Sequence, residues 1–507
     1  MLGQVSPLVG PKIDWWALTP LLILLGGGLV LLVAAAMTPT WKRNLYALAT
    51  SAVALGAGVV AAIHWNDISD HGDKFLVAGS LRFDRFSMFL TITICAAVIL
   101  ASLQMSDYLP REGMEGPEVY GLLLMSAIGG IVMGAANDLI VLFLGLETLS
   151  IALYVLAASH RKRIESQEAG LKYFVLGGFA SAFLLYGIAL VYGATGSTKL
   201  IDDGTGDSVF AHLRSHVILT GRERSLLLAG VALLLVGLLF KVAAVPLHWW
   251  TPDVYQGAPT PVTAFMASAA KAAAFAAMLR VLTYGLASQQ DSWRPVIWVV
   301  AILTLVGGSV LAVVQTNVKR MLAYSSISHA GFILVGVEAV SRNGTAGSLF
   351  YLLAYAVLVC GTFGIVTLVA GRGDAATDLA SFRGLGKRKP TLALAMTVFL
   401  LAQAGVPLTS GFVAKFGVIS AAVDRHSYPL AIVAMLSAVI GAFLYLRILV
   451  SMYFADAEPG DDDRPAIAVP VLAGVGIVLS LAFTLVVGFF PGWLISLSKH
   501  AVPVVIG

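Results

Sequence analysis

Residues 226–246 read LLLAGVALLLVGLLFKVAAVP, and this stretch decides the fold. Its first fifteen residues carry no charge, and Lys241 and Pro246 then interrupt the run. A helix needs about 20 apolar residues to cross the hydrocarbon core of a bilayer. Only helices and closed barrels satisfy their backbone groups in lipid, and the run lacks the alternation of a barrel strand, so it predicts a membrane helix. The proline predicts a break in that helix next to the lysine.

Similar apolar runs fill the rest of the chain, which has 507 residues, of which 58% are hydrophobic and 12% charged. Because the mean hydropathy is +0.89, a soluble enzyme is excluded. The 32 basic and 28 acidic residues are scattered, so nucleic acid is not expected as a partner. We expect fourteen spans, near residues 18–37, 45–64, 83–103, 119–135, 138–158, 168–192, 226–245, 261–286, 295–314, 318–340, 347–370, 392–421, 429–454 and 466–490.

The connections after the odd-numbered spans carry most of the basic residues, and this bias predicts that they face the cytoplasm. These residues are Lys42, Arg43, Arg161, Lys162, Arg163, Lys319, Arg320, Arg383, Lys387, Arg388 and Lys389. An even number of spans then places both termini on the non-cytoplasmic side. The long connection 193–225 also carries arginines but weighs less in this rule. The acidic run 461–463 reads as a solvated connection.

A few ionisable residues persist inside the apolar spans, where they are functional candidates by default. Their order repeats after five spans: Glu147, Lys241 and Lys271 lie in spans five, seven and eight, and His329, Lys415 and Arg447 lie in spans ten, twelve and thirteen. Since consecutive spans alternate in direction, an odd offset predicts two inverted five-helix repeats. Each repeat has a lysine beside a proline in its fourth span, and both helices should be broken. The predicted units are residues 1–118, 119–293 (first repeat), 294–456 (second repeat) and 457–507.

These residue types suit proton transfer. Burial disfavours the charged form of a lysine and a nearby carboxylate favours it, so lysine and Glu147 can exchange a proton, whereas snorkelling lysines beside packing kinks are the structural alternative. His329 could connect the lysines or make an interhelical contact. Lys172 could join the route or snorkel. His248 shares a face with Lys241 only if the helix continues past Pro246; otherwise it ends the helix beside two tryptophans, which look like aromatic anchors.

Neither a metal nor an organic cofactor is expected in this chain. Cys95 and Cys360 lie in apolar runs and read as small buried hydrophobes, so they cannot form a disulfide framework or a thiolate cluster. No phosphate-binding loop or nucleophile constellation is present in the sequence. Arg447 stays protonated, which suits an electrostatic or structural role rather than proton transfer.

Four stretches together resemble one known family. They are NDLIVLFLGLE (137–147), EAGLKYFVLGGFASAFLLYG (168–187), KVAAVPLHWWTPDVYQGAPTPVT (241–263) and SSISHAG (325–331). The chain resembles the antiporter-like membrane subunits of respiratory complex I, the proton-translocating NADH:quinone oxidoreductase, over nearly its whole length, and within them the subunit N branch. One departure is QAGVPL at 403–408, where the family more often has LAGIPP; the long connection 193–225 is another.

The resemblance implies that Glu147, Lys241, Lys271 and Lys415 form a proton route whose halves His329 connects. It implies a bacterial plasma membrane location and lateral contact with antiporter-like subunit M and the small membrane subunits J and K. Flavin, iron–sulfur clusters and quinone would belong to partner subunits. An Mrp-type sodium/proton antiporter subunit and a structural scaffold remain the alternatives, because the sequence does not reveal whether the ion is a proton or sodium.

Overall fold

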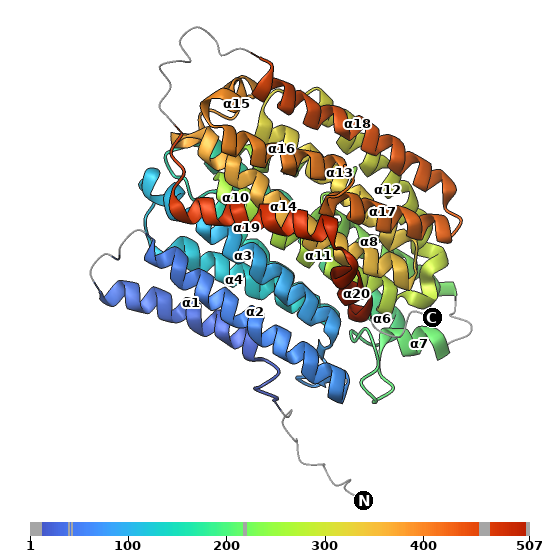
Figure 1. Cartoon of the computed structure of the whole chain (residues 1–507). Coiled ribbons are helices and arrows are strands. Elements are labelled where there is room, and N and C mark those ends of the chain that lie inside the picture. The colour runs from blue at the N-terminus through green and yellow to red at the C-terminus, as the bar shows by residue number, and fades with distance from the viewer. Residues whose placement is uncertain (1–12, 39–40, 42–43, 216–220, 456–466, 503–507) are drawn as a thin grey trace, which may run out of the picture.

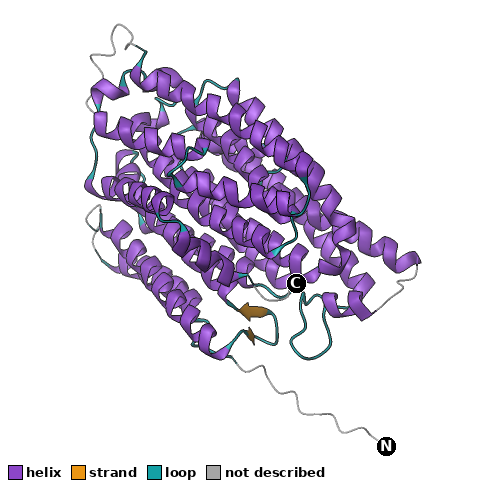
Figure 2. Cartoon of the chain, turned by 45° about the vertical axis from the view of Figure 1, so that its right-hand side comes forward, coloured by secondary structure: helices purple, strands orange, loops and turns teal. Residues whose placement is uncertain are grey.

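The computed structural model describes residues 13–38, 41, 44–215, 221–455 and 467–502. Figure 1 shows the helices of these segments side by side in one bundle, with the connections gathered at its two ends. In that view α1 and α2 lie along one edge of the bundle and α18 lies along the opposite edge. The strands β1 and β2 form an antiparallel hairpin at one end (Figure 2), with Lys74 opposite Phe83. The described part of the chain is therefore a helical bundle with one small hairpin.

The first half comprises α1 (Thr19–Met37), α2 (Leu45–His71), β1 (Lys74–Leu76), β2 (Leu81–Phe83), α3 (Arg85–Arg111), α4 (Pro117–Ala135), α5 (Leu139–Ala157), α6 (Ile164–Thr195), α7 (Val209–Ser215), α8 (Gly221–Lys241), α9 (Trp250–Gly257), α10 (Thr260–Phe265), the π-helix η1 (Met266–Ala270), α11 (Lys271–Leu279) and the π-helix η2 (Arg280–Gly285). The second half comprises η3 (Ala287–Gln289), α12 (Gln290–Val313), α13 (Val318–Glu338), α14 (Arg342–Ala370), η4 (Arg372–Asp374), η5 (Leu379–Phe382), α15 (Leu385–Arg388), α16 (Pro390–Ala404), α17 (Ser410–Asp424), α18 (Tyr428–Tyr453), α19 (Val471–Phe489) and α20 (Gly492–Ala501).

The predicted all-α membrane architecture is confirmed. Within the described residues, 13 helices are long and apolar enough to cross a membrane, and the expected twelfth span is the pair α16 and α17. Helix ends differ from the hydropathy boundaries where capping decides them. For example, α3 begins after Asp84, whose side chain accepts the Ser87 N–H in a capping box, and continues to Arg111. The run at 461–463 and the basic pair at 42–43 lie outside the described residues.

Both predicted helix breaks are confirmed. Helix α8 ends at Lys241, and the chain stays non-helical around Pro246 until α9 begins at Trp250. Helix α16 ends at Ala404, and α17 begins at Ser410, with Pro407 between them. Proline removes a backbone donor and clashes with the preceding turn, so neither helix runs straight through. These breaks create helix ends inside apolar spans. The unpaired backbone groups at those ends need hydrogen-bond partners, because lipid supplies none.

A short backbone bridge fastens the start of α5 to a distant loop. The Leu139 N–H donates to the Thr198 carbonyl at 2.9 Å, and the Leu200 N–H donates to the Asn137 carbonyl at 2.7 Å. The same bridge occurs at the start of α13, five spans later. There the Val318 N–H donates to residue 377 at 2.7 Å, and the residue 379 N–H donates to residue 316 at 2.8 Å. The four residues of the second bridge correspond one to one with those of the first, and the sequence separation is the same for every corresponding pair.

The helix pairs that carry these bridges also pack alike. A Cβ atom on Gly129 of α4 would lie 2.4 Å from the Leu149 amide nitrogen of α5. A Cβ atom on Gly308 of α12 would lie 2.5 Å from the Ser328 amide nitrogen of α13. Only glycine allows this approach of two backbones. Because α5 and α13 are five spans apart, their bridges lie at opposite ends of the bundle, which agrees with the predicted inverted repeat.

Candidate functional site

Lys241 is the last residue of α8 and is buried at the first helix break. Its Nζ donates to the Ser150 Oγ at 2.7 Å and to the Tyr173 hydroxyl at 3.3 Å. The same ammonium lies 5.2 Å from the centre of the Tyr173 ring and 5.9 Å from that of Tyr154. The last carbonyls of α8 have other partners, since those of Leu238 and Leu239 accept from backbone N–H groups beyond the helix. Hydroxyls and aromatic faces thus replace water around this buried cation.

Glu147 lies on α5, one turn before Ser150, and interacts electrostatically with Lys241. The two side chains do not form an ion pair within the described structure. The Glu147 Oε1 is buried and has no hydrogen-bond partner among the described residues. A carboxylate in this position favours the charged lysine without holding its proton in a direct contact. The structure therefore brings the predicted pair into one neighbourhood.

Lys271 begins α11, directly after the π-helix η1, and is 4% exposed. Its Nζ lies 2.5 Å from both the Ser326 Oγ and the Ser326 carbonyl oxygen, and 5.8 Å from the centre of the Tyr355 ring. Single π-helical turns inside α-helices are frequent at functional sites. The lysine therefore projects onto α13, in the middle of the fully buried span that Thr260–Gly285 forms.

His329 connects several buried hydroxyls on α13, α14 and α18. Its Nδ1 lies 2.7 Å from the Tyr351 hydroxyl, and its Nε2 lies 3.1 Å from the Tyr445 hydroxyl. Tyr445 is in turn 2.5 Å from the Ser325 Oγ, which donates to the Gln403 Oε1 at 3.4 Å. The direct partners of His329 are therefore two tyrosine hydroxyls, and an imidazole between two hydroxyls can accept a proton on one nitrogen and release one from the other.

Lys415 lies at the second helix break, next to this series of hydrogen bonds. Its Nζ donates to the carbonyl oxygens of Gln403 at 2.8 Å and Ala404 at 3.0 Å, the last carbonyls of α16. The ammonium also lies 4.8 Å from the centre of the Phe332 ring. Lys415 and Lys271 both act electrostatically on His329, which lies between them. The structure thus brings three predicted residues into one buried group.

The two lysine clusters are not joined directly. Among the described residues, no hydrogen bond runs from the Lys241 cluster to the Lys271 cluster. Each cluster recruits hydroxyl and amide groups that sequence reasoning did not single out: Ser150, Tyr173, Tyr351, Gln403 and Tyr445. Serine and tyrosine are common in these spans, so their presence in the sequence does not mark a site residue. Gln403 had a detectable signal, because LLAQAGVPL at 400–408 parallels LLFKVAAVPL at 238–247 and places Gln403 opposite Lys241.

Lys172 and His248 lie apart from these clusters. Lys172 is 40% exposed and pairs with Asp253 at 2.8 Å and Glu168 at 2.7 Å, as a residue at the end of a span can. The condition for placing His248 on the Lys241 face is not met, because the helix ends at Lys241. His248 instead stacks beside the exposed Trp249, with ring centroids 5.6 Å apart.

Trp249 and Trp250 are the two tryptophans that the sequence suggests as aromatic anchors, and for Trp250 this expectation is wrong. It is 4% exposed, stacks on Tyr173 at 4.6 Å, and donates its indole N–H to the Phe240 carbonyl at 3.1 Å. This bond satisfies one of the last carbonyls of α8. The tryptophan after the break therefore folds back to cover the cluster around Lys241.

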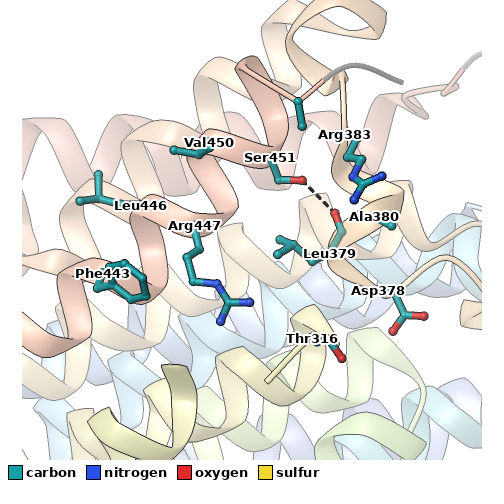
Figure 3. Close-up of a pocket in the computed structure, with 11 residues that line it drawn as sticks. Thr316, Asp378, Leu379, Ala380, Arg383, Phe443, Leu446, Arg447, Val450 and Ser451 are labelled. Carbon is teal, nitrogen blue, oxygen red and sulfur yellow. Dashed lines mark hydrogen bonds between the residues drawn. The ribbon is translucent and has the colours of Figure 1, made fainter. Parts of the chain in front are cut away.

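Arg447 has the structural placement that its permanent charge suggests. Its guanidinium donates to the Val313 carbonyl at the end of α12. It also lines a cavity of about 820 Å³ with Thr316, Asp378 and Arg383 (Figure 3). A cation at a helix C-terminus is stabilised by the carbonyls there.

Buried ion pairs at the ends of the bundle include charges that sequence reasoning missed or misplaced. The sequence suggests that Lys319 is a loop charge, but it is fully buried, with its Nζ 3.2 Å from the Asp374 Oδ2. Asp374 also accepts from Arg163, Tyr108 and the Thr260 N–H. Burial acts to raise the pKa of Asp374, but attraction to Lys319 and Arg163 outweighs it and holds the pKa below its usual value.

Arg280 was not among the predicted buried charges. It is 1% exposed and pairs with both carboxylate oxygens of Asp84, at 2.6 and 2.7 Å, while its Nε donates to the Gly134 carbonyl. Burial acts to raise the pKa of Asp84, but Arg280 and Arg82 lower it further than burial raises it. A bidentate pair of this kind fastens the end of the span formed by Thr260–Gly285 to the start of α3. Among the described residues, no three His, Cys, Asp or Glu side chains gather as a metal site.

The fold and site define an integral membrane protein of the ion-translocating class, with broken helices and buried lysines. The family model for the transmembrane region of NADH:quinone oxidoreductase and Mrp antiporter proteins matches residues 136–441, and the chain belongs to this family. It is 43% identical to NADH-quinone oxidoreductase subunit N 3 of Streptomyces griseus over 98% of this chain and 95% of that protein. It is 40% identical to NADH-quinone oxidoreductase subunit N of Trichlorobacter lovleyi over 94% and 95%. Respiratory complex I from Thermus thermophilus contains a chain with a TM-score of 0.77 and 30% identity, covering 95% of this chain and 99% of that one.

Proposed function

We propose that this chain is the proton-translocating membrane subunit N of an NADH:quinone oxidoreductase. The names of its relatives support membership of that oxidoreductase complex, and the family description supports a transporter-like role. In this proposal Glu147, Lys241, Lys271, His329 and Lys415 carry protons, and Lys172 and His248 are retained as lesser candidates. Flavin, iron–sulfur clusters and quinone act in partner subunits, which include subunits M, J and K. The termini face the non-cytoplasmic side of a bacterial plasma membrane.

One observation carries the proposal: a buried hydrogen-bonded series runs from the Gln403 side chain through Ser325 and Tyr445 to His329, while Lys415 binds the Gln403 backbone carbonyl. Each member can donate and accept a proton or supports one that does. Ionisable groups of this kind are costly within a membrane unless they line an ion route. Transfer between the Lys241 and Lys271 clusters needs a carrier besides the side chains of the two clusters, and internal water is the natural one.

The test is Lys271→Ala in the assembled complex, studied in inverted membrane vesicles. Redox-driven proton uptake and NADH oxidation are measured together, with Lys74→Ala in the β-hairpin as a matched lysine control. We expect Lys271→Ala to lower proton uptake by roughly tenfold or more per NADH oxidised, because the central base is removed, and the control to pump normally. Undiminished pumping in Lys271→Ala would support the scaffold alternative.

An Mrp-type sodium/proton antiporter subunit is the second candidate. The family description, which names both groups of proteins, favours keeping it. Sodium uptake measured in the same vesicles separates the two. Sodium movement that depends on Lys271 favours the antiporter, and proton movement that persists without sodium favours the complex I subunit.

A further inference from the structure

Two cavities at one end of the bundle share the side chain of Tyr154. The outer cavity has a volume of about 880 Å³ and lies between the start of α4, the end of α5 and α6, where His160, Glu112 and Tyr154 are among its lining residues. The inner chamber has a volume of about 10 Å³ and is bounded by Tyr154, Ser150 and Lys241. That volume is near the least that one water molecule occupies. Tyr154 is therefore the partition between an open cavity and the buried lysine.

The outer cavity is rich in groups that bind protons. Glu112, Glu115, Glu118 and His160 line it, together with Arg161 and Lys162. The His160 Nε2 lies 3.2 Å from the Glu112 Oε2, and its Nδ1 is buried without a hydrogen-bond partner among the described residues. His160 is only 6% exposed, although it lines the cavity. An imidazole that is paired on one nitrogen and open on the other can take up a proton and pass it on.

The packing around Tyr154 leaves its hydroxyl against the backbone of α6. A Cβ atom on Gly177 would lie 2.1 Å from that hydroxyl, so only glycine leaves room for it. Tyr154 follows Ser150 by one turn of α5, and the two side chains share a face. The Ser150 Oγ is 2.7 Å from the Lys241 Nζ. Tyr154, Ser150 and Lys241 thus form a short polar series leading inward from the outer cavity.

We propose that this outer cavity is the proton uptake route to Lys241, with Tyr154 as the group that passes each proton through the partition. This inference rests on the proposed function and adds to it the residues of one access path. The Tyr154 hydroxyl accepts a proton from the cavity side as it releases its own toward the neutral amine of Lys241. Tyr154 returns to its neutral form, Lys241 gains one proton, and the cavity loses one, so charge and protons balance.

The first test blocks the cavity in the assembled complex. Ser159→Cys places a thiol on the wall of the outer cavity, and Thr316→Cys places one in the cavity of about 820 Å³ in Figure 3, which shares no lining residue with the chamber of Lys241. Each complex is treated with N-ethylmaleimide, labelling is quantified by mass, and proton uptake is compared before and after labelling. Cys95 and Cys360 are buried in this chain. The parent complex, treated identically, accounts for thiols in other subunits.

We expect labelled Ser159→Cys to lose at least about half of its proton uptake per NADH oxidised, while labelled Thr316→Cys keeps its uptake. Failure of Ser159→Cys to label would show that the cavity is closed in the complex and would overturn the proposal. Full labelling with unchanged uptake would overturn it too. Lys271→Ala tests the proposed function separately, so a complex that needs Lys271 but tolerates a blocked cavity has its uptake route elsewhere.

The second test is Tyr154→Phe, which keeps the ring beside Lys241 and removes only the hydroxyl. Tyr186→Phe on the exposed face of α6 is the matched control. We expect proton uptake to fall severalfold in Tyr154→Phe and to stay unchanged in the control. With a protonophore present, NADH oxidation should be normal in both variants. A merely structural Tyr154 would leave the ratio of protons moved to NADH oxidised unchanged in Tyr154→Phe, which would contradict its role in transfer.

Discussion

The two helix breaks have similar sequences but obtain their buried cation in opposite ways. In the first break, LLFKVAAVPL puts Lys241 at the end of the preceding helix, and its side chain reaches hydroxyls on α5 and α6. In the second break, LLAQAGVPL has Gln403 at the matching position, and Lys415 comes from the helix after the break. Lys415 then reaches back to the carbonyls that α16 leaves unpaired. Both breaks therefore bury an ammonium, but hydroxyls bind the one at the first break and helix-end carbonyls bind the one at the second.

This difference teaches that a helix break can hold a buried ammonium with different partners, either hydroxyls of neighbouring helices or the carbonyls of the helix end. The last carbonyls of a helix carry partial negative charge and lack intrahelical partners, so at the second break they can bind a cation from the following helix. Gln403 keeps a second task at its position, because its amide donates to the Thr362 Oγ1 at 2.8 Å and its oxygen accepts from Ser325. The second break thereby links its lysine to the chain that leads to His329.

The largest expected effect comes from moving the cation of the second break. Lys415→Met should lower redox-driven proton uptake by roughly tenfold or more, because the carbonyls of α16 lose their proton carrier. Adding Gln403→Lys to that variant returns an ammonium to the position of Lys241. We expect part of the uptake to return, but not all, because the amide link to Ser325 is lost. Inverted vesicles containing the assembled complex provide the measurement.

A control for this pair is Gln403→Lys alone, which places two ammonium groups together and should lower uptake through repulsion. If the double variant pumps no better than Lys415→Met, the two breaks are not equivalent sites for a cation. The two breaks would then be similar in sequence but not in function.

The N-termini of α10 and α17, two helices that lie beyond the breaks, are also capped differently. The Thr260 N–H at the start of α10 donates to the distant Asp374 carboxylate, whereas α17 is capped locally by Thr409, whose Oγ1 accepts the Phe412 N–H. Asp374→Ala should destabilise this end of the protein by about 3–5 kcal/mol, because it leaves Lys319 buried without its partner. Thr409→Ala should cost about 1 kcal/mol, the value of one hydroxyl cap. Thermal unfolding and hydrogen exchange of α10 and α17 in the solubilised complex measure both.

The pH dependence of the Asp374 contact has a defined sign. Because its pKa is lowered on folding, the carboxylate contributes its full stabilisation above its ordinary pKa of about 3.9, and this contribution is lost as the pH falls through the lower folded value. We expect the stability difference between the native protein and Asp374→Asn to be constant near neutral pH and to shrink below about pH 4. A difference that changes between pH 6 and 8 would assign the dependence to another group.

Hydropathy and proline placement were enough to predict the membrane fold and both breaks, because apolar composition and proline are local features of each span. Pairing between distant residues leaves no such local signal. Arg280 pairs with Asp84, which lies far away in the sequence. Lys319 looks like a loop charge because its partner, Asp374, lies beyond the next span. Glu147, Lys241, Lys271, His329 and Lys415 could be singled out as rare ionisable groups in apolar surroundings.

The neighbours of those residues could not be derived in the same way. Whether Tyr445 faces His329 or lipid depends on the rotation of α18, which the sequence does not reveal, since the helix is apolar all round. His248 shows a related limit, because its position depends on where the helix ends before Pro246 and not on spacing. The inverted repeat and the roles of the site residues stay predictions.

The smallest expected effects concern the backbone of the breaks. Two residues beyond Lys241, Ala243 has a φ of 62°, and two residues beyond Gln403, Gly405 has a φ of 93°. Left-handed backbone costs alanine about 1 kcal/mol and glycine almost nothing. Ala243→Gly should therefore leave stability within about 1 kcal/mol of the native protein or raise it slightly.

Gly405→Ala should destabilise the second break by at least about 1 kcal/mol. Its new Cβ would also lie 3.0 Å from the Lys415 Cδ and displace the ammonium from the α16 carbonyls. We therefore expect a loss of proton uptake in Gly405→Ala that Ala243→Gly does not show, measured beside thermal unfolding of both complexes. Equal uptake in the two variants would mean that the lysine of the second break tolerates displacement, and that its contact with the helix end matters less than the presence of its charge.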